Sequence, residues 1–395
     1  MLRWLMIVRF CVVAVCGVCS WQVAWAETPA SFSYSLFDGQ SLQGWNIENG
    51  CEADVVDGQL RLKAGNGWLR SDHQYSDFKL HVEWKALQAA KYDAGIFIRT
   101  ANGGAPFPKQ SYQINLLQGK AGNIGNLPGA SSTGLVKEED WNSFDITVVG
   151  ETVALEINGK PAYKTGGLKV RVGYVGFQIE VPLGGQYLIR NIQLTELNTK
   201  ALFNGKDLTG WEGVGEPAEK CWKVADGLLL CTGQPGPWIR SAAEYGDFNL
   251  RLEYQVDAGG NSGVYVRVPA DGKHHRENDT APPAGFEVQI LDDDDPQYKN
   301  LKDYQFSASV YDIAGAQPHV CKPHGQWNTL EINCQGGNIS TTHNGKIVTR
   351  VTPETHPLSK LRQLKGFLGL QNHSSQVKFR NVRIGPPQPL AESQK

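Results

Sequence analysis

An internal repeat constrains the fold of this chain more than any other feature of its sequence. Leu36–Trp45 has the pattern Leu-Phe-x-Gly-x-x-Leu-x-Gly-Trp, and Leu202–Trp211 repeats it. Further matches follow in the same order and end at Arg190–Ile192 and Arg380–Val382. The period is far longer than the roughly 20–50 residues of a solenoid unit. We therefore predict two whole domains in tandem, 31–197 and 200–385.

Hydrophobic and polar residues alternate within each repeat, and this period of two is typical of β-strands. Phe248–Tyr254 and Val377–Ile384 show the alternation, and Asp-Gly or Asn-Gly pairs between such runs indicate turns. No segment has the period of an amphipathic helix. Many short strands joined by regular turns predict an all-β chain made of two-sheet sandwiches or jelly rolls. The Pro-rich tail, 386–395, is expected to be disordered.

Residues 1–26 have the organisation of a secretory signal peptide. The basic residues Arg3 and Arg9 precede an apolar run, and the segment ends with Ala24 and Ala26 around a tryptophan. We expect cleavage after Ala26 and a periplasmic or secreted mature protein. The alternative is a membrane anchor, which a short apolar run interrupted by polar residues does not favour. No later segment is long and apolar enough for a membrane span.

Three of the eight cysteines lie in this leader, which leaves five in the mature chain. Export permits disulfides, but an odd number leaves at least one thiol without an intrachain partner. Cys221 and Cys231 flank an Asp-Gly turn and are candidates for a bridge across a hairpin. Cys321 and Cys334 are the other candidate pair, with Cys51 left over. The alternative is that these residues are buried thiols.

Composition excludes one class of partner and favours another. The whole chain has a formal net charge of −2. Without the two basic residues of the leader the charge is about −4, so nucleic acid is not an expected partner. The 44 glycines suit tight turns, and the 11 tryptophans of an exported chain suit stacking on the apolar faces of sugar rings. We therefore expect an oligosaccharide or glycoside as the ligand.

Strand alternation also predicts which side chains meet, because residues two apart on a strand point to the same face. In Phe248–Tyr254, the leucines and the tyrosine should face the core, and the charged residues should point outward. If neighbouring strands place their polar faces together, six side chains of the second domain converge on one concave sheet: Glu253, Arg267, Glu287, Gln289, Gln371 and His373. Carboxylates and an imidazole can transfer protons, Arg can stabilise negative charge, and amides can bind hydroxyls.

Several segments of the second repeat carry a more specific resemblance, and they have counterparts in the first repeat. They are Leu202–Trp211, Asn261–Arg267, Phe286–Asp292, Leu368–His373 and Phe379–Val382. Together they resemble the 3-keto-disaccharide hydrolase domain family, which is 3-keto-glucoside lyase- or hydratase-like. The resemblance covers both halves and implies two concanavalin-like jelly-roll sandwiches, an exported bacterial protein, and cleavage of glycosides that are oxidised at the sugar C3.

The implied chemistry suits the deduced polar face. A ketone at C3 acidifies the C2 hydrogen, so a base can remove it, the C1 substituent leaves by β-elimination, and water then adds. As a hypothesis, His373 or Glu287 is the base, and Arg267, alone or with a divalent metal ion, stabilises the enolate. Glu253 or Gln289 orients the sugar hydroxyls. The remaining residues expected to bind substrate are Gln371, Asn261 and Tyr265.

The first repeat departs from this pattern at three of the candidate positions. Gln113 replaces Glu287, Asn115 replaces Gln289, and Glu180 stands where His373 does, so we expect a degenerate site there.

The acidic run Asp292–Asp295 is also absent from the first repeat. It either holds a calcium ion or forms a solvated loop. The alternative to an enzyme is a non-catalytic, lectin-like carbohydrate-binding module, because this fold serves both purposes. A structural cell-surface protein is the third alternative.

Overall fold

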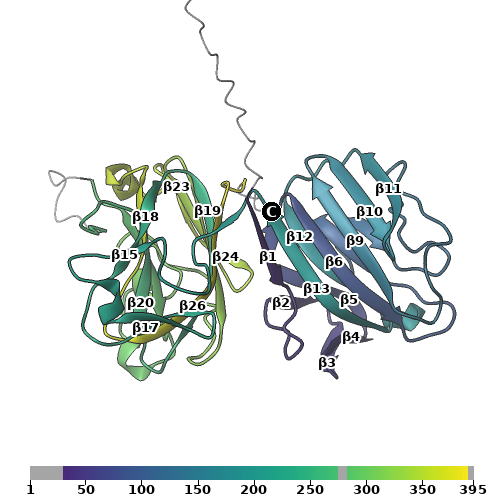
Figure 1. Ribbon diagram of the computed structural model, residues 1–395, viewed down its shortest axis with the longest axis horizontal. Helices are drawn as coiled ribbons and strands as arrows, with labels where there is room; N and C mark the ends of the chain where they lie inside the picture. Colours follow the sequence, from purple (N-terminus) through teal and green to yellow (C-terminus); the bar gives the residue numbers. More distant parts are fainter. Residues whose placement is uncertain (1–29, 275–282, 390–395) are drawn as a thin grey trace, which may run out of the picture.

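The computed structural model describes residues 30–274 and 283–389 and contains two β-sandwiches that lie side by side (Figure 1). Each sandwich pairs an eight-stranded sheet with a five-stranded sheet, and all strand pairings within the sheets are antiparallel as far as the described residues go. The prediction of two all-β sandwiches is confirmed. The proposed signal peptide and most of the predicted disordered tail lie outside the described residues.

The first domain begins with β1 (Ser31–Ser35) and ends with β13 (Tyr187–Leu197). Its large sheet has the order β11-β10-β9-β6-β13-β4-β3, with β1 also paired to β13. The other strands of that sheet are β3 (Glu52–Val56), β4 (Gln59–Ala64), β6 (Phe78–Ala86), β9 (Asn142–Val149), β10 (Thr152–Ile157) and β11 (Lys160–Gly166). Its small sheet has the order β2-β5-β12-β7-β8. These strands are β2 (Trp45–Glu48), β5 (Asn66–Tyr75), β7 (Gly95–Thr100), β8 (Tyr112–Asn115) and β12 (Gly173–Glu180), with the short helix η1 (Val181–Leu183).

The second domain repeats this topology from β14 (Lys200–Ala201) to β26 (Gln376–Gly385). Its large sheet has the order β16-β17-β26-β19-β22-β23-β24, with β14 also paired to β26. The other strands of that sheet are β16 (Trp222–Ala225), β17 (Leu228–Thr232), β19 (Phe248–Val256), β22 (Asn328–Gln335), β23 (Asn338–His343) and β24 (Lys346–Val351). The small sheet has the order β15-β18-β25-β20-β21. These strands are β15 (Trp211–Gly213), β18 (Ile239–Tyr245), β20 (Asn261–Val268), β21 (Phe286–Leu291) and β25 (Gly366–Leu370).

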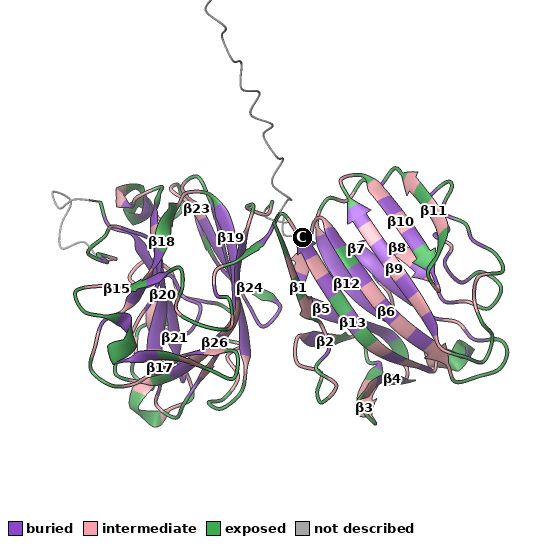
Figure 2. Ribbon diagram, in the orientation of Figure 1, coloured by how far each residue is buried: buried purple, intermediate pink, exposed green. Residues whose placement is uncertain are grey.

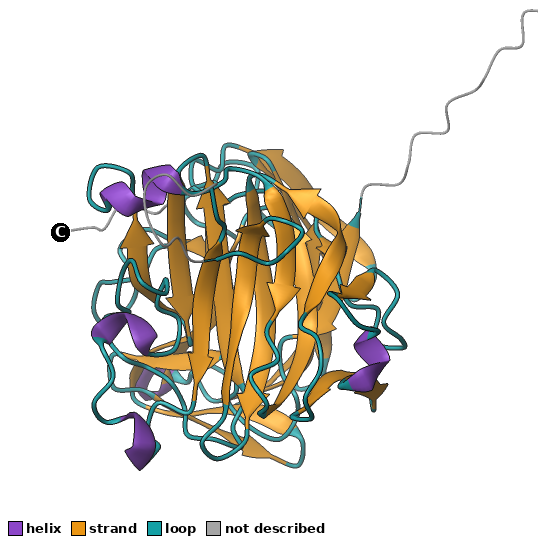
Figure 3. Ribbon diagram, turned by 90° about the vertical axis from the view of Figure 1, so that its left-hand side faces the viewer, coloured by secondary structure: helices purple, strands orange, loops and turns teal. Residues whose placement is uncertain are grey.

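Short 3₁₀ turns lie in the loops outside the sheets of the second domain, as Figure 3 shows with the second domain toward the viewer. They are η2 (Ala218–Lys220), η3 (Pro296–Tyr298), η4 (Asp303–Gln305) and η5 (Pro357–Leu361). Two connections are longer here than in the first domain. Residues 269–285 join β20 to β21, where 101–111 join β7 to β8, and residues 292–327 correspond to 116–141. The second domain therefore has more chain with which to build walls around its small sheet.

The core of each domain lies between its two sheets, as the alternation predicts. Leu250, Leu252 and Tyr254 of β19 are buried in the second core. Burying such side chains stabilises a domain by roughly 1.5–3 kcal/mol each. Figure 2 shows the same alternation of buried and more exposed residues along the strands of the first domain. The outward neighbour Arg251 is nevertheless only 3% exposed, because the first domain covers this face of the second large sheet.

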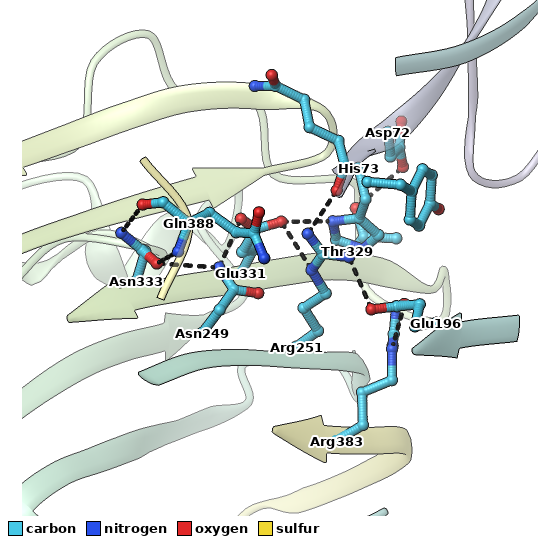
Figure 4. Close-up of polar contacts among 12 residues, drawn as sticks. Asp72, His73, Glu196, Asn249, Arg251, Thr329, Glu331, Asn333, Arg383 and Gln388 are labelled. Carbon is cyan, nitrogen blue, oxygen red and sulfur yellow. Dashed lines mark hydrogen bonds and ion pairs between the residues drawn. The ribbon is translucent and has the colours of Figure 1, made fainter. Parts of the chain in front are cut away.

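A buried charge network joins the two domains (Figure 4). Arg251 of β19 contacts Glu196 of β13 at 2.9 Å and Glu331 of β22 at 3.1 Å. Arg383 of β26 contacts the other oxygen of Glu196 at 2.8 Å, and His73 of β5 contacts Glu331 at 3.0 Å. Each carboxylate therefore meets two cationic or imidazole partners, which compensates for the loss of hydration.

Hydrogen bonds extend this network along the interface. Thr329 donates to Asp72 at 2.9 Å, and the Gln74 carbonyl accepts from Arg251 at 2.6 Å. At the rim, Gln43 of the first domain donates to the Trp327 carbonyl and accepts from Lys322 at 2.7 Å. The first domain thus covers the outer face of the second large sheet with matched polar groups.

All five cysteines outside the leader are free thiols, and four of them are buried. The candidate bridges Cys221–Cys231 and Cys321–Cys334 are absent. In the hairpin, Cys231 lies opposite Trp222, so Cys221 does not face it directly. Cys321 instead lies against Tyr254 and the Leu291 carbonyl. The alternative of buried thiols is therefore correct.

Across the described residues, no helix is long and apolar enough to cross a membrane.

We expect Glu331→Gln to lower the free energy of unfolding at pH 7 by about 3–5 kcal/mol, because one partner of a buried ion network is removed. Although burial raises it, the charge of Arg251 and the contact with His73 lower the pKa of Glu331 to about 2. This stabilisation is therefore present above the usual value of 4.5 and is lost as the pH falls toward 2. Denaturant titrations between pH 7 and pH 3 should show the two proteins converging.

The control is Glu151→Gln, which removes an exposed pair with Arg171. It should change the unfolding free energy by less than about 1 kcal/mol at any of these pH values. Equal stability of Glu331→Gln and the parent at pH 7 would contradict a stabilising interface.

Candidate functional site

The face of the second small sheet that points away from the core carries a hollow of about 250 Å³. This sheet lies on the side of the domain away from the first domain (Figure 1). Strands β20, β21 and the segment after β25 supply the floor, and the longer loops supply the walls. The lining residues are Asn261, His274, Glu287, Gln289, Leu291, Tyr298, Leu301, Gln305, Tyr311, Gln371 and His373.

A carboxylate–imidazole pair is the most strongly polar feature of the pocket. Glu287 of β21 is only 4% exposed, and its Oε2 lies 2.9 Å from Nε2 of His274. Burial alone would lower the pKa of His274, but its hydrogen bond and charge interaction with Glu287 outweigh burial and raise it above 6.5. This imidazole therefore keeps its proton to a higher pH than an isolated histidine.

Aromatic rings and amides hold this pair in place. The His274 ring stacks on Tyr265 with centroids 4.8 Å apart, and Trp238 meets the other side of Tyr265 edge-on at 5.2 Å. Gln371 donates through Nε2 to the Tyr265 hydroxyl at 2.9 Å. Its Oε1 is shielded from solvent and has no hydrogen-bond partner among the described residues.

The remaining polar groups leave capacity for a ligand. Gln289 donates to Asn261 only over a long 3.4 Å contact. His373 is exposed at the rim of the pocket and makes no hydrogen bond with any residue that the structure describes. Gly263 lies directly opposite Gln289 on the neighbouring strand, and a Cβ there would overlap Oε1 of Glu287. Glycine is therefore needed for the carboxylate to lie across the sheet.

Four of the six residues expected to converge line the pocket together with Asn261, and two do not; Tyr265, which was expected to bind substrate, stacks on His274 and is not part of the lining. Glu253 lies on β19, which pairs with β22 and β26 of the large sheet, and it binds Arg380 and Asn381. The expectation that its strand adjoins the others is wrong. Its role in orienting sugar hydroxyls in this pocket is therefore not supported by its position.

Arg267 also lies outside the pocket. A register shift lies between Tyr265 and Val268, and Arg267 has φ +53°, so the alternation of faces breaks at this residue. Its guanidinium is fully buried and donates to the carbonyls of Gly246 and Gly336, with Asp247 at 3.1 Å. Arg267 braces two loops at the far end of the sheet and cannot reach an enolate in the pocket.

Sequence patterns missed His274 and the wall residues Tyr298, Gln305 and Tyr311. His274 and Tyr311 stand on loops, and Tyr298 and Gln305 on short 3₁₀ turns, so period-two alternation carries no information about their direction. The one available signal for His274 was a pair of histidines in the unusually long connection that leads into the strand of Glu287.

The acidic run contributes to a structural turn. Asp292 is 2% exposed, accepts from the Gly259 amide and contacts His324 at 3.2 Å. Asp295 caps η3 by accepting from the Gln297 amide. Asp293 and Asp295 are partly exposed and Asp294 is exposed, as a solvated loop predicts, so the solvated-loop interpretation is wrong only for Asp292. Within 30–274 and 283–389, no group of three or more His, Cys, Asp or Glu side chains could hold a metal ion.

The matched face of the first domain is filled by its own side chains. Gln113 donates to Gln178, which donates to Glu180 at 2.7 Å, so the amides satisfy one another. Trp68, Phe97 and Tyr174 form a separate buried cluster, with Phe107 of the shorter loop packed against it. The aromatic layer that supports His274 in the second domain is thus covered in the first.

We expect the NMR titration of His274 in the intact protein to have a midpoint above 6.5. In Glu287→Gln the midpoint should fall below that value, because burial then acts without the carboxylate. Loss of the resonance in His274→Ala identifies it. A midpoint that Glu287→Gln leaves unchanged would exclude the ion pair in solution.

Comparison with known proteins agrees with the repeat. The family model of the 3-keto-alpha-glucoside-1,2-lyase-like domain matches residues 33–195 and 198–385. A 3-keto-disaccharide hydrolase of Bacteroides thetaiotaomicron is 30% identical over 221 residues, which cover 46% of this chain and 76% of that protein.

Two solved structures from Parabacteroides distasonis, both of candidate glycosyl hydrolases, are also similar. One is 30% identical and covers 48% of this chain and 98% of its own, with a TM-score of 0.40. The other is 25% identical and covers 48% and 95%, with a TM-score of 0.41. From the two family matches, which span both domains, we conclude that this chain belongs to the 3-keto-alpha-glucoside-1,2-lyase-like domain family and is a carbohydrate-active enzyme of the glycoside hydrolase type.

Proposed function

We propose that the second domain cleaves 3-keto-glycosides, including 3-keto-disaccharides, by β-elimination at C1 followed by hydration. The observation that carries the proposal is the buried Glu287–His274 pair in a pocket that His373 also lines, since this arrangement offers both a proton acceptor and a proton donor. The name of the Bacteroides relative and the description of the family support the substrate class.

The oxidised sugar makes this route chemically accessible. A C3 ketone stabilises the carbanion at C2 as an enolate, so an ordinary side chain can remove the C2 proton. The enolate then expels the C1 oxygen, and that oxygen needs a proton to leave as an alcohol. The products are an α,β-unsaturated keto sugar and an alcohol, and water adds to the former to give net hydrolysis. No oxocarbenium ion and no pair of carboxylates at glycosidase spacing is required.

We assign the base to His373 and the acid to Glu287 with His274. His373 has no competing hydrogen bond with the described residues, so its imidazole is available to take the C2 proton. His274 carries a proton beside Glu287, and this pair can deliver it to the departing C1 oxygen. The acid function should be lost at high pH, when His274 deprotonates.

Amide groups account for sugar recognition. Gln289 and Asn261 line the pocket and offer both donors and acceptors to sugar hydroxyls. Their N–H groups take the place of Arg267 as stabilisers of the enolate oxygen. The pocket of about 250 Å³ is below the roughly 300–1,000 Å³ of sites for drug-sized ligands, which suits one sugar ring with the leaving group outside.

We propose that these steps use the protein's own side chains, because Glu287 is already paired with His274. Assays with and without chelator test this point directly.

Export also belongs to the proposal. The leader of residues 1–26 would deliver the enzyme to the periplasm or the medium, where it would meet extracellular glycosides.

We expect His373→Ala and Glu287→Gln each to lower kcat on 3-keto-trehalose or 3-keto-sucrose by about 10²–10⁴-fold, the usual contribution of a general acid or base. The rate is measured as the reducing sugar that the mature enzyme releases from the 3-keto-disaccharide. The ultraviolet absorbance of an unsaturated ketone in single-turnover experiments would reveal the elimination step.

The matched controls are Glu180→Ala and Gln113→Ala, which alter the equivalent positions of the first domain. They should leave kcat unchanged, because that face is filled. Full activity in both second-domain variants would rule out the assignment. Binding of the keto sugar without any turnover by the parent protein would instead support the lectin-like alternative.

Gly263→Ala offers a second, steric test of the pocket. The new Cβ would overlap Oε1 of Glu287 and displace the carboxylate, so we expect kcat to fall by about 100-fold. Gly95→Ala creates the same overlap with Gln113 in the first domain. Gly95→Ala should lower the melting temperature about as much as Gly263→Ala does, but it should leave kcat unchanged. Equal activity of the two variants would argue against a working site on the second sheet.

A further inference from the structure

Two pocket residues stand on a segment that has left its sheet. Strand β25 ends at Leu370, and Gln371 and His373 follow it. Gln371 is still tied to β20, because its amide donates to Gly263 and its carbonyl accepts from Ser262. Beyond it, the chain turns at Ser374, which has φ +56°. Another contact must therefore fix the direction of the segment at His373.

The side chain of Asn372, between these two residues, supplies that contact. Its Nδ2 donates to the carbonyls of Gln234 at 2.9 Å and Gly236 at 3.1 Å. Its Oδ1 accepts from the amide of Ser374 at 3.0 Å, which closes the turn directly after His373. One amide thus links the pocket segment to the loop after β17.

Two thiols complete the surroundings of this amide. Nδ2 of Asn372 donates to Sγ of Cys221, and Sγ of Cys231 donates to its Oδ1, both at 3.3 Å. Burial raises the pKa of Cys221 and raises the pKa of Cys231 to about 11. Both therefore stay protonated, so one sulfur can accept and the other can donate. The hydrogen bonds of both thiols with the Asn372 amide account for the closeness of Cys221 and Cys231 without a disulfide.

The first domain lacks this arrangement. At the positions matched to Asn372 and Cys231 it has Ile179 and Leu62, which are fully buried in its apolar core. Burying an amide is costly unless its polar atoms are hydrogen-bonded, as those of Asn372 are. The polar residues occur in the second domain, which has the pocket, and the apolar residues occur in the first domain, whose matched face is filled by its own side chains.

We propose that Asn372 is a positioning residue that, together with Cys221 and Cys231, fixes the direction of His373 at the pocket. The geometric part of this proposal is independent of the reaction. Its catalytic consequence rests on the proposed function, because His373 is the base assigned there.

The first test is spectroscopic. The Cε1–H resonance of His373, identified by its loss in His373→Ala, should shift toward the position of free histidine and change its line width in Asn372→Ala. Asn372→Asp, which keeps Oδ1 but loses the donors to Gln234 and Gly236, should give the same direction of change. It serves as the second variant if Asn372→Ala does not fold. An unchanged resonance in a folded variant would overturn the proposal.

Asn328→Ala is the matched control. This asparagine is fully buried in the same domain and its Oδ1 accepts from Lys322 and Asn344, but it does not line the pocket. Its loss should lower the melting temperature without moving the His373 resonance. If it moves that resonance as far as Asn372→Ala does, the effect is general loosening of the domain, and the proposal fails.

The second test is a double-mutant cycle in the activity assay. Asn372→Ala should lower kcat by about 10- to 100-fold in the parent and have no further effect in the His373→Ala background, because it acts through His373. Fully additive losses would overturn the positioning role. If the parent itself has no activity on 3-keto sugars, the proposed function fails, and the NMR comparison still decides the role of Asn372.

Discussion

The relation between the two domains depends on the buried charges around Glu196 and Glu331. Two arginines and a histidine meet these carboxylates at a face of the second large sheet that would otherwise be solvated. Each ion is costly to bury alone and tolerable only with its partners in place. The network therefore fixes one arrangement of the domains and leaves the small sheet of the second domain facing solvent, where a ligand can reach it (Figure 1).

The same scaffold supports unequal chemistry because loops and a few strand positions differ. In the second domain, longer connections bring His274 onto Tyr265 and leave space beside Glu287. In the first, a shorter connection brings Phe107 onto the matched aromatic residues, and Gln113 bonds to Gln178. The two repeats therefore share the design of their cores, whereas the second has a pocket and the first covers the large sheet of its neighbour.

Local periodicity predicted much of this structure, and its failures have identifiable causes. Alternation correctly placed Leu250 and Tyr254 in the core and Glu287, Gln371 and His373 around one pocket. It failed for Arg267, where a bulge with positive φ reverses the face, and for Glu253, because alternation does not reveal which sheet a strand joins. His274 and the domain interface depend on loop paths and long-range packing, which no local pattern records.

The interface of the two copies also constrains how such a gene can change. Arg251 and Arg383 lie on one repeat and Glu196 on the other, whereas the first repeat has His81 and Gln193 at the positions of those arginines. Exchange of one repeat for the other by recombination would therefore place unmatched groups at the junction. The two repeats now carry different residues at their interface, so neither repeat can be replaced by a copy of the other without disrupting the junction.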